Sequence, residues 1–258
     1  WVLLIGVLGG MLLHNAIILF FYIRKNWRKQ KGEENRRRFN RSEIWQHSLF
    51  LISFVLLALS GFMLAYPDHW WARTMTALGV DETARRLIHR VSAVVMVAVS
   101  LYHLYWIAFT SYGRGELKRI APRLRDAREL LQNMRFHMGK SEQQAAFAKF
   151  DYPAKMEYWA LVWGTVVMAL TGAILWFPVV ATSIFPSWIV DVATVIHLFE
   201  AWLATLAILI FHFFFVIFHP EVYPLSFAML RGTMPSRLAE HHHPAWRKED
   251  DAPAPAEE

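Results

Sequence analysis

Five apolar runs, each long enough to cross a lipid bilayer, constrain this sequence more than any other feature. A helix needs about 20 apolar residues to span a hydrocarbon core of about 30 Å. Strongly basic segments separate several of the runs, which is not the pattern of one soluble domain of 258 residues. The sequence therefore predicts an all-α integral membrane protein. The runs are 2–23, 44–66, 87–109, 156–177 and 188–218.

Basic residues between these runs indicate how the chain is oriented. Lys and Arg gather in 24–41 and 114–155, whereas 178–188 contains neither. Because cytoplasmic loops carry the excess of Lys and Arg, these two segments and the tail after residue 220 are expected in the cytoplasm, and the N-terminus outside. The formal net charge of +6 thus follows from topology and does not indicate nucleic-acid binding.

The chain is expected to have three parts. Residues 1–41 form a leading transmembrane helix and basic linker, 42–235 form a four-helix domain, and 236–258 form a cytoplasmic tail that ends in the disorder-prone stretch DDAPAPAEE. The charged amphipathic segment RIAPRLRDARELLQNMRF, residues 119–136, predicts a helix on the inner surface. Basic residues follow the first run, the reverse of a signal peptide, so we expect extracytoplasmic residues before Trp1 in a longer or processed protein.

Histidine is the metal ligand that this chain offers within its apolar runs, because there is no Cys for disulfides, thiolate clusters or a CxxCH haem site. His89 and His103 are 14 residues apart, and His197 and His212 are 15 apart. Both spacings are close to four helical turns, so each pair lies on one face, about 21–22 Å apart. His89 and His197 are expected at the outer level, and His103, His212 and His47 at the inner level.

Two planar cofactors, each held between two imidazoles, fit this arrangement. Haem iron accepts axial His ligands, and two such ligands favour electron transfer over oxygen chemistry. Ligation also accommodates imidazoles that hydrocarbon would otherwise reject. A single membrane His more often bonds a neighbouring residue, but two level-matched pairs favour haem. We expect His219 at the interface, and His69, His137 and His241–His243 in solvated loops or the tail.

A weak internal repeat supports two helix pairs of similar design. The second run ends LSGFMLAYP and the fourth ends LTGAILWFP. The small residues Ser60–Gly61 and Thr171–Gly172 predict close approach between helices at these two points. The repeat would pair His103 with His212 at the inner level, as in the cytochrome b of bc complexes.

Several stretches resemble the b-type cytochrome subunit of respiratory formate dehydrogenases and the related hydrogenase and thiosulfate reductase cytochromes, over about 40–248. The stretches are RSEIWQHSLF, RRLIHRVSAVV, KMEYWALVWGTVVMALTGAILWFP, VIHLFEAWLATLAILIFHF and HHHPAWRKE. The resemblance implies four helices and two b haems, the outer held by His89 and His197 and the inner by His47 and His212. It also implies a cytoplasmic-side quinone site, for which the candidates are Asp151, Tyr152 and Lys155.

The alternatives for His103 remain open at this point. We favour His47 as the inner ligand, which leaves His103 to contact a haem propionate or the quinone. A third haem held by His14 and His103 is a further possibility. Other polar residues also have candidate roles: Arg73 and Arg90 as partners of the outer haem propionates, and Glu200, three residues after His197, as a partner of a ligand or a buried water.

These observations predict an electron-transfer subunit of a quinone-linked oxidoreductase complex in the bacterial cytoplasmic membrane. Electrons would pass between menaquinone or ubiquinone at the cytoplasmic side and an extracytoplasmic subunit or domain with multihaem c-type or iron–sulfur centres. The leading helix would take the place of a partner subunit's membrane helix. Two alternatives are a cofactor-free proton or metal transporter or channel, which the scarcity of polar residues disfavours, and a structural anchor of a redox complex.

Overall fold

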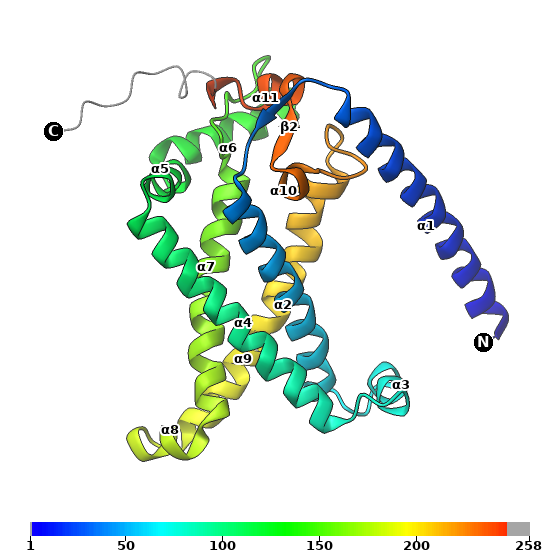
Figure 1. The fold of residues 1–258 in the computed structure, drawn as a ribbon, viewed down its shortest axis with the longest axis vertical. Coiled ribbons are helices and arrows are strands. Elements are labelled where there is room, and N and C mark those ends of the chain that lie inside the picture. Colours follow the sequence, from blue (N-terminus) through cyan, green and yellow to red (C-terminus); the bar gives the residue numbers. More distant parts are fainter. Residues whose placement is uncertain (1, 247–258) are drawn as a thin grey trace. The chain divides into compact units, whose positions relative to one another are not determined.

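In this computed structural model, residues 2–246 are described, and they divide into two compact units. One unit contains 2–44, 146–149 and 210–246, and the other contains 45–145 and 150–209. The acidic end of the tail, for which disorder is expected, lies outside the described residues. Figure 1 shows the order of the elements along the chain.

The five apolar runs form helices that are long and apolar enough to cross a membrane. Most of their large apolar side chains are exposed, which suits lipid contact rather than water. The prediction of an all-α membrane bundle with an additional N-terminal helix is confirmed. The helices are α1 (Val2–Lys31), α2 (Arg41–Ala65), α4 (Glu82–Phe109), α7 (Tyr152–Trp176) and α9 (Trp188–Ala207), the last of which continues through π-helical turns at Ile208–His212 and Phe214–Phe218.

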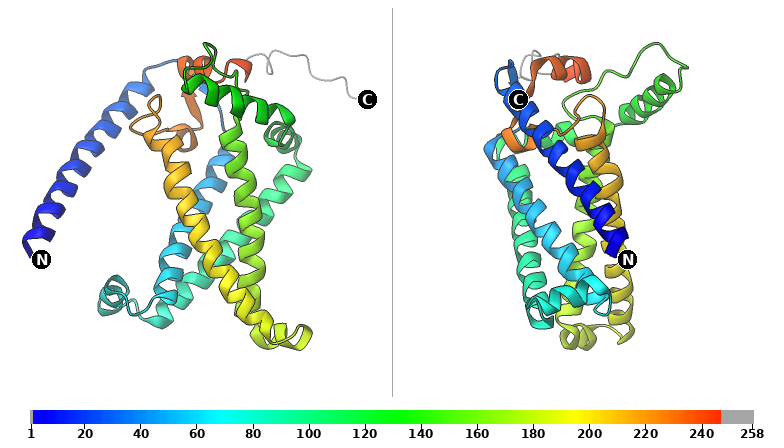
Figure 2. Two further views of the ribbon diagram at one scale, coloured as in Figure 1. Left: turned by 180° about the vertical axis from the view of Figure 1, so that it is seen from behind. Right: turned by 90° about the vertical axis from the view of Figure 1, so that its right-hand side faces the viewer.

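Polar residues fix where these helices begin. Asp81 caps α4 by accepting a hydrogen bond from the Ala84 amide, and Asp151 caps α7 by accepting one from the Ala154 amide. Short helices lie at the two ends of the long ones: α3 (Trp70–Ala77) and α8 (Pro178–Ile184) at one end, and α5 (Ser111–Ile120) and α6 (Leu124–His137) at the other (Figure 2).

The amphipathic segment 119–136 is helical, as predicted, but it is divided between α5 and α6. The break at residues 121–123 coincides with Pro122, which lacks the amide hydrogen that a continuous helix needs. α6 is tied to α7 by a buried ion pair between Lys155 Nζ and Asp126 Oδ1, 2.7 Å apart. The indole of Trp159 donates to the Ile120 carbonyl at the end of α5.

A two-stranded antiparallel sheet in the first unit is not predicted by the sequence. β1 (Asn35–Arg37) pairs with β2 (Thr233–Pro235), with Arg36 opposite Met234. The short helices α10 (Ala228–Arg231) and α11 (Ser236–His242) flank β2. Strands of three residues carry too little alternation to be recognised from hydropathy, so only their pairing defines them.

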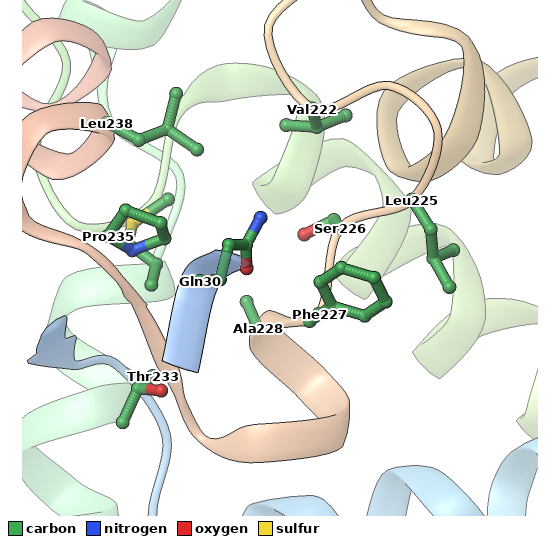
Figure 3. Close-up of a pocket in the computed structure, with 10 residues that line it drawn as sticks. Gln30, Val222, Leu225, Ser226, Phe227, Ala228, Thr233, Pro235 and Leu238 are labelled. Atoms are coloured by element: carbon green, nitrogen blue, oxygen red, sulfur yellow. The ribbon is translucent and has the colours of Figure 1, made fainter. Parts of the chain in front are cut away.

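A small cavity in the same unit lies beside the end of α1. Figure 3 shows Gln30 projecting among Val222, Ser226 and Phe227. Its volume of about 10 Å³ offers room for no more than about one water molecule. The cavity is therefore too small for an organic cofactor.

The expectation that His243 is solvated is wrong, because this residue is only 5% exposed. Its Nδ1 donates to the Ala148 carbonyl at 2.6 Å, and Arg38 donates to its Nε2 at 2.7 Å. This geometry requires the neutral ring, since a proton on Nε2 would face the guanidinium. Burial, and then the charge of Arg38, lower the pKa of His243 from 6.5 to about 2. His69, His137 and His241 are exposed, as expected.

This lowered pKa predicts that the segment around α11 loses stability in mild acid. The unfolded segment takes up a proton near pH 6.5, whereas the folded one does not, so stability is complete above that pH. Stability then falls by at most about 1.4 kcal/mol for each pH unit below 6.5. Amide hydrogen exchange of 236–246 between pH 7.5 and 5, corrected for intrinsic rates, should show this loss. His243→Gln should remove this loss, leaving only the pH dependence of the ion pairs of His241 and His242 with Glu221. Equal protection at both pH values in the unmodified protein would contradict the prediction.

Candidate haem site

Two histidines from different helices lie close together inside the second unit. His89 of α4 and His197 of α9 are half-buried, and their ring centres lie 6.3 Å apart with the ring planes at 66°. Metal–imidazole bonds are about 2 Å long, so two axial imidazoles on one metal ion have ring centres about 6 Å apart. The observed spacing therefore fits one metal ion between the two rings.

Hydroxyl groups fix which nitrogen of each ring is available. Ser60 Oγ lies 3.1 Å from His89 Nδ1, and Thr171 Oγ1 lies 2.8 Å from His197 Nδ1. Each hydroxyl gives its hydrogen to the carbonyl four residues earlier in its own helix. The oxygen must then accept from Nδ1–H, which leaves Nε2 with a free lone pair. Both imidazoles are thus held in the tautomer that can ligate a metal through Nε2.

A glycine follows each hydroxyl and makes room for the same ring. A Cβ at Gly61 would lie 3.1 Å from His89 Cε1, and a Cβ at Gly172 would lie 3.4 Å from His197 Cε1. The internal repeat predicted close approach at these residues, and the structure shows that an imidazole edge is what approaches. The sequence did not predict that Ser60 and Thr171 bond the two histidines. The signal for it was a hydroxyl residue directly before glycine in both halves of the repeat.

His103 is placed differently from His89 and His197. Its Nδ1 lies 2.6 Å from Gln46 Oε1, and its Nε2 lies 2.9 Å from the Tyr158 hydroxyl. Both ring nitrogens therefore have partners within the second unit. His14 lies exposed on α1 in the other unit, with its Nδ1 near the Asn15 side chain. A haem shared by His14 and His103 stays a prediction.

Comparison with known proteins identifies the family. The model of the prokaryotic cytochrome b561 family matches residues 38–232. The chain belongs to this family. It is 26% identical over 214 residues to the cytochrome b556(fdo) subunit of formate dehydrogenase from Escherichia coli, covering 82% of this chain and 92% of the relative.

Two further relatives carry similar names. The nitrate-inducible formate dehydrogenase cytochrome b556(Fdn) subunit of Escherichia coli is 28% identical over 203 residues, which is 79% of this chain and 86% of the relative. A formate dehydrogenase cytochrome b556 subunit from Haemophilus influenzae is 24% identical over 206 residues, 79% of each chain. The resemblance inferred from the sequence is thereby confirmed. The chain is a multi-pass protein of the bacterial inner membrane.

Members of this family bind b-type haem, and the residues present fit that group. His89 and His197 supply two neighbouring imidazoles with Nε2 available, because the hydroxyls of Ser60 and Thr171 bond their Nδ1 atoms. When bound, the haem would supply a one-electron carrier, which His89 and His197 would hold.

The two glycines of this cytochrome give a matched test of ring packing. Gly61→Ala forces the His89 ring to move by a few tenths of an ångström, whereas Gly172→Ala makes an ordinary contact. Overpacking of this kind lowers the free energy of unfolding by about 1–3 kcal/mol. We expect thermal melts followed by haem absorbance to show a lower midpoint for Gly61→Ala than for Gly172→Ala. Equal midpoints would mean that the ring is not tightly held at Gly61.

Other polar residues with candidate roles have partners within the second unit. The Arg90 guanidinium lies over the Trp176 ring at 5.1 Å, and Arg73 pairs with Asp68 at 3.3 Å in an exposed ion pair. The Glu200 carboxylate lies against α7, since a Cβ at Gly164 would be 2.9 Å from its Oε1. The expected contacts of Arg73 and Arg90 with haem propionates stay predictions.

The expected quinone-site residues lie at the start of α7. Asp151 caps this helix, Lys155 pairs with Asp126, and the Tyr152 hydroxyl accepts a hydrogen bond from Asn133 at 3.2 Å. These contacts tie α7 to α6, and a contact with quinone stays a prediction.

The expected inner haem ligands lie on α2 and at the end of a π turn. His47 is half-buried on α2, and His212 closes the turn Ile208–His212. π-Helical turns inside α-helices are frequent at functional sites, because the additional residue changes which side chains face inward. The sequence could not show this turn, which depends on how the helix packs.

Proposed function

We propose that this chain is the dihaem b-type electron-transfer subunit of a quinone-linked oxidoreductase complex. The observation that carries the proposal is the neighbouring pair His89 and His197, 6.3 Å between ring centres, each with its Nδ1 bonded to a hydroxyl. Two closed axial positions suit electron transfer rather than catalysis at the metal. In this proposal the chain carries electrons to or from the quinone. Its partner carries out the chemistry on the other substrate of the complex.

The second haem is proposed to bind His47 and His212. The family resemblance supports this pair, and the π turn at His212 is consistent with a functional position. His103 has hydrogen-bond partners at both ring nitrogens within the second unit, and the proposal leaves it outside the haem ligands.

The proposed electron path joins a cytoplasmic-side quinone to an extracytoplasmic partner. The printed names of the relatives, cytochrome subunits of formate dehydrogenase, support a role in a multi-subunit redox complex. The basic segments 24–41 and 114–155 support the proposed orientation, and Asp151, Tyr152 and Lys155 remain the candidate quinone contacts. The partner would carry multihaem c-type or iron–sulfur centres, and the leading helix α1 would take the place of a partner subunit's membrane helix.

A reduced-minus-oxidised absorption spectrum, with a pyridine haemochrome assay for haem per chain, tests the proposal. We expect b-type bands and two haems per chain. Three haems would favour the additional site of His14 and His103. No haem, in protein purified from haem-replete membranes, would overturn the proposal.

A further inference from the structure

Three polar side chains form a hydrogen-bonded chain between helices of the second unit. Gln46 of α2, only 6% exposed, accepts from His103 of α4 at 2.6 Å. His103 in turn lies 2.9 Å from the hydroxyl of Tyr158 on α7. The chain therefore joins three membrane-spanning helices through side chains that hydrocarbon alone would not hold together.

The direction of each hydrogen bond follows from the chemistry of the end residues. The Gln46 oxygen can only accept, so His103 Nδ1 carries the hydrogen. His103 Nε2 then accepts, and the Tyr158 hydroxyl donates to it. The Trp106 ring stacks on the imidazole, with ring centres 6.0 Å apart and planes at 29°. The arrangement is that of a base held by an orienting group on one side and a proton donor on the other.

The position of this chain matches the side at which the quinone is expected. Gln46 and Tyr158 lie in the second turns of α2 and α7, and His103 lies about two turns before the end of α4. At 1.5 Å per residue, all three are about 8–9 Å from helix ends that adjoin basic segments. Tyr158 is half-buried, unlike Gln46.

We propose that Tyr158 and His103 carry protons between a bound quinone and this end of the bundle, and that Gln46 is the positioning residue that holds the imidazole. This inference rests on the proposed function, because it assigns the proton step of the same quinone reaction. It also assigns His103 to proton transfer rather than to haem ligation.

The chemistry requires such a path. Oxidation of a quinol to a quinone releases two electrons and two protons, and haem iron takes only the electrons. The transfer occurs twice, once for each proton. Each time, a quinol oxygen gives its proton to the Tyr158 oxygen while Tyr158 gives its hydroxyl proton to His103 Nε2. The resulting imidazolium keeps its Nδ1–H on Gln46 and gives the Nε2 proton to a water molecule on the path to the helix ends, which returns His103 to its neutral form. Quinone reduction runs the same steps in reverse, with electrons from the haems.

Tyr158→Phe in the complete haem-loaded complex tests the proposal, because it removes one oxygen and little else. General acid–base groups contribute about 10²–10⁴-fold to rates. We therefore expect haem reduction by a ubiquinol or menaquinol analogue, followed by stopped flow, to slow at least about tenfold. Haem per chain and the haem spectrum should not change. Tyr105→Phe is the matched control, since Tyr105 lies on α4 but is 58% exposed, and its rate should equal that of the unmodified protein.

Variants of the other two residues separate the competing explanations. His103→Gln should keep both haems and slow the quinol reaction, and loss of a haem would show that His103 is a ligand and overturn the proposal. Gln46→Leu should slow the reaction, whereas Gln46→Glu, which keeps an acceptor oxygen, should restore it. Unchanged rates in Tyr158→Phe and His103→Gln, or equal slowing in Tyr105→Phe, would overturn the inference while leaving the dihaem assignment intact. Absence of haem in the unmodified protein would instead overturn the proposed function.

Discussion

His197→Leu is expected to remove one haem per chain and to abolish electron transfer through the protein. The substitution deletes one of the two neighbouring imidazoles, and a leucine of similar size offers no lone pair to iron. His89→Leu should have the same effect, because the two ring centres lie 6.3 Å apart. The pyridine haemochrome assay should fall from two haems to one, and quinol-dependent electron flow to the partner should fall below detection.

The control for this pair is a histidine that the structure places at the surface. His137→Leu, at the end of α6, should keep both haems and full electron flow, because this residue is exposed. A structural anchor would tolerate His197→Leu without loss of electron flow. A cofactor-free transporter would show no haem before or after the change. Retention of two haems in both His89→Leu and His197→Leu would contradict the ligand assignment.

Thr171→Val is expected to weaken haem binding without removing a ligand. The methyl group that replaces the hydroxyl keeps the volume but leaves the His197 Nδ1–H without its acceptor at 2.8 Å. Loss of such a supporting hydrogen bond typically costs 10–100-fold in metal affinity. We expect haem to transfer to an apo-haem acceptor protein about 10–100 times faster from this variant.

Thr171→Ser is the matched control, because it keeps the oxygen and removes only a methyl group. Its haem transfer should remain close to that of the unmodified protein. Ser60→Ala should reproduce the loss at His89, whose Nδ1 lies 3.1 Å from the Ser60 hydroxyl. If Thr171→Val and Thr171→Ser release haem equally fast, the hydroxyl does not orient the ring, and packing alone must do so.

Sequence patterns predicted the parts of this protein that depend on local physics. A bilayer accepts only segments whose backbone groups are satisfied internally and whose side chains are apolar, so each span is visible as a run of residues. Helical periodicity is also local, and it placed His89 and His197 among the candidate ligands on α4 and α9. The resemblance to a known family rested on the same stretches and was confirmed by the match over 38–232.

Tertiary structure decided which distant residues meet. The hydrogen bond between Ser60 and His89 joins α2 to α4, and the bond between Thr171 and His197 joins α7 to α9. No periodicity in one helix shows which neighbour it packs against, or which way a side chain turns. The same reason explains why the partners of His103, Gln46 and Tyr158, could not be predicted from helix periodicity.

The burial of His243 shows most clearly what local sequence cannot predict. Its place after two other histidines in a polar, Pro-containing stretch favours solvent exposure, yet the ring is buried between Arg38 and the Ala148 carbonyl. Those partners are far away in the chain.

The sequence by itself determined the membrane spans and the residue types available as ligands, because hydrophobic burial and helix period act between near neighbours. Only the fold decided the tautomer, partner and exposure of each histidine, because those depend on hydrogen bonds between segments that chain order does not pair.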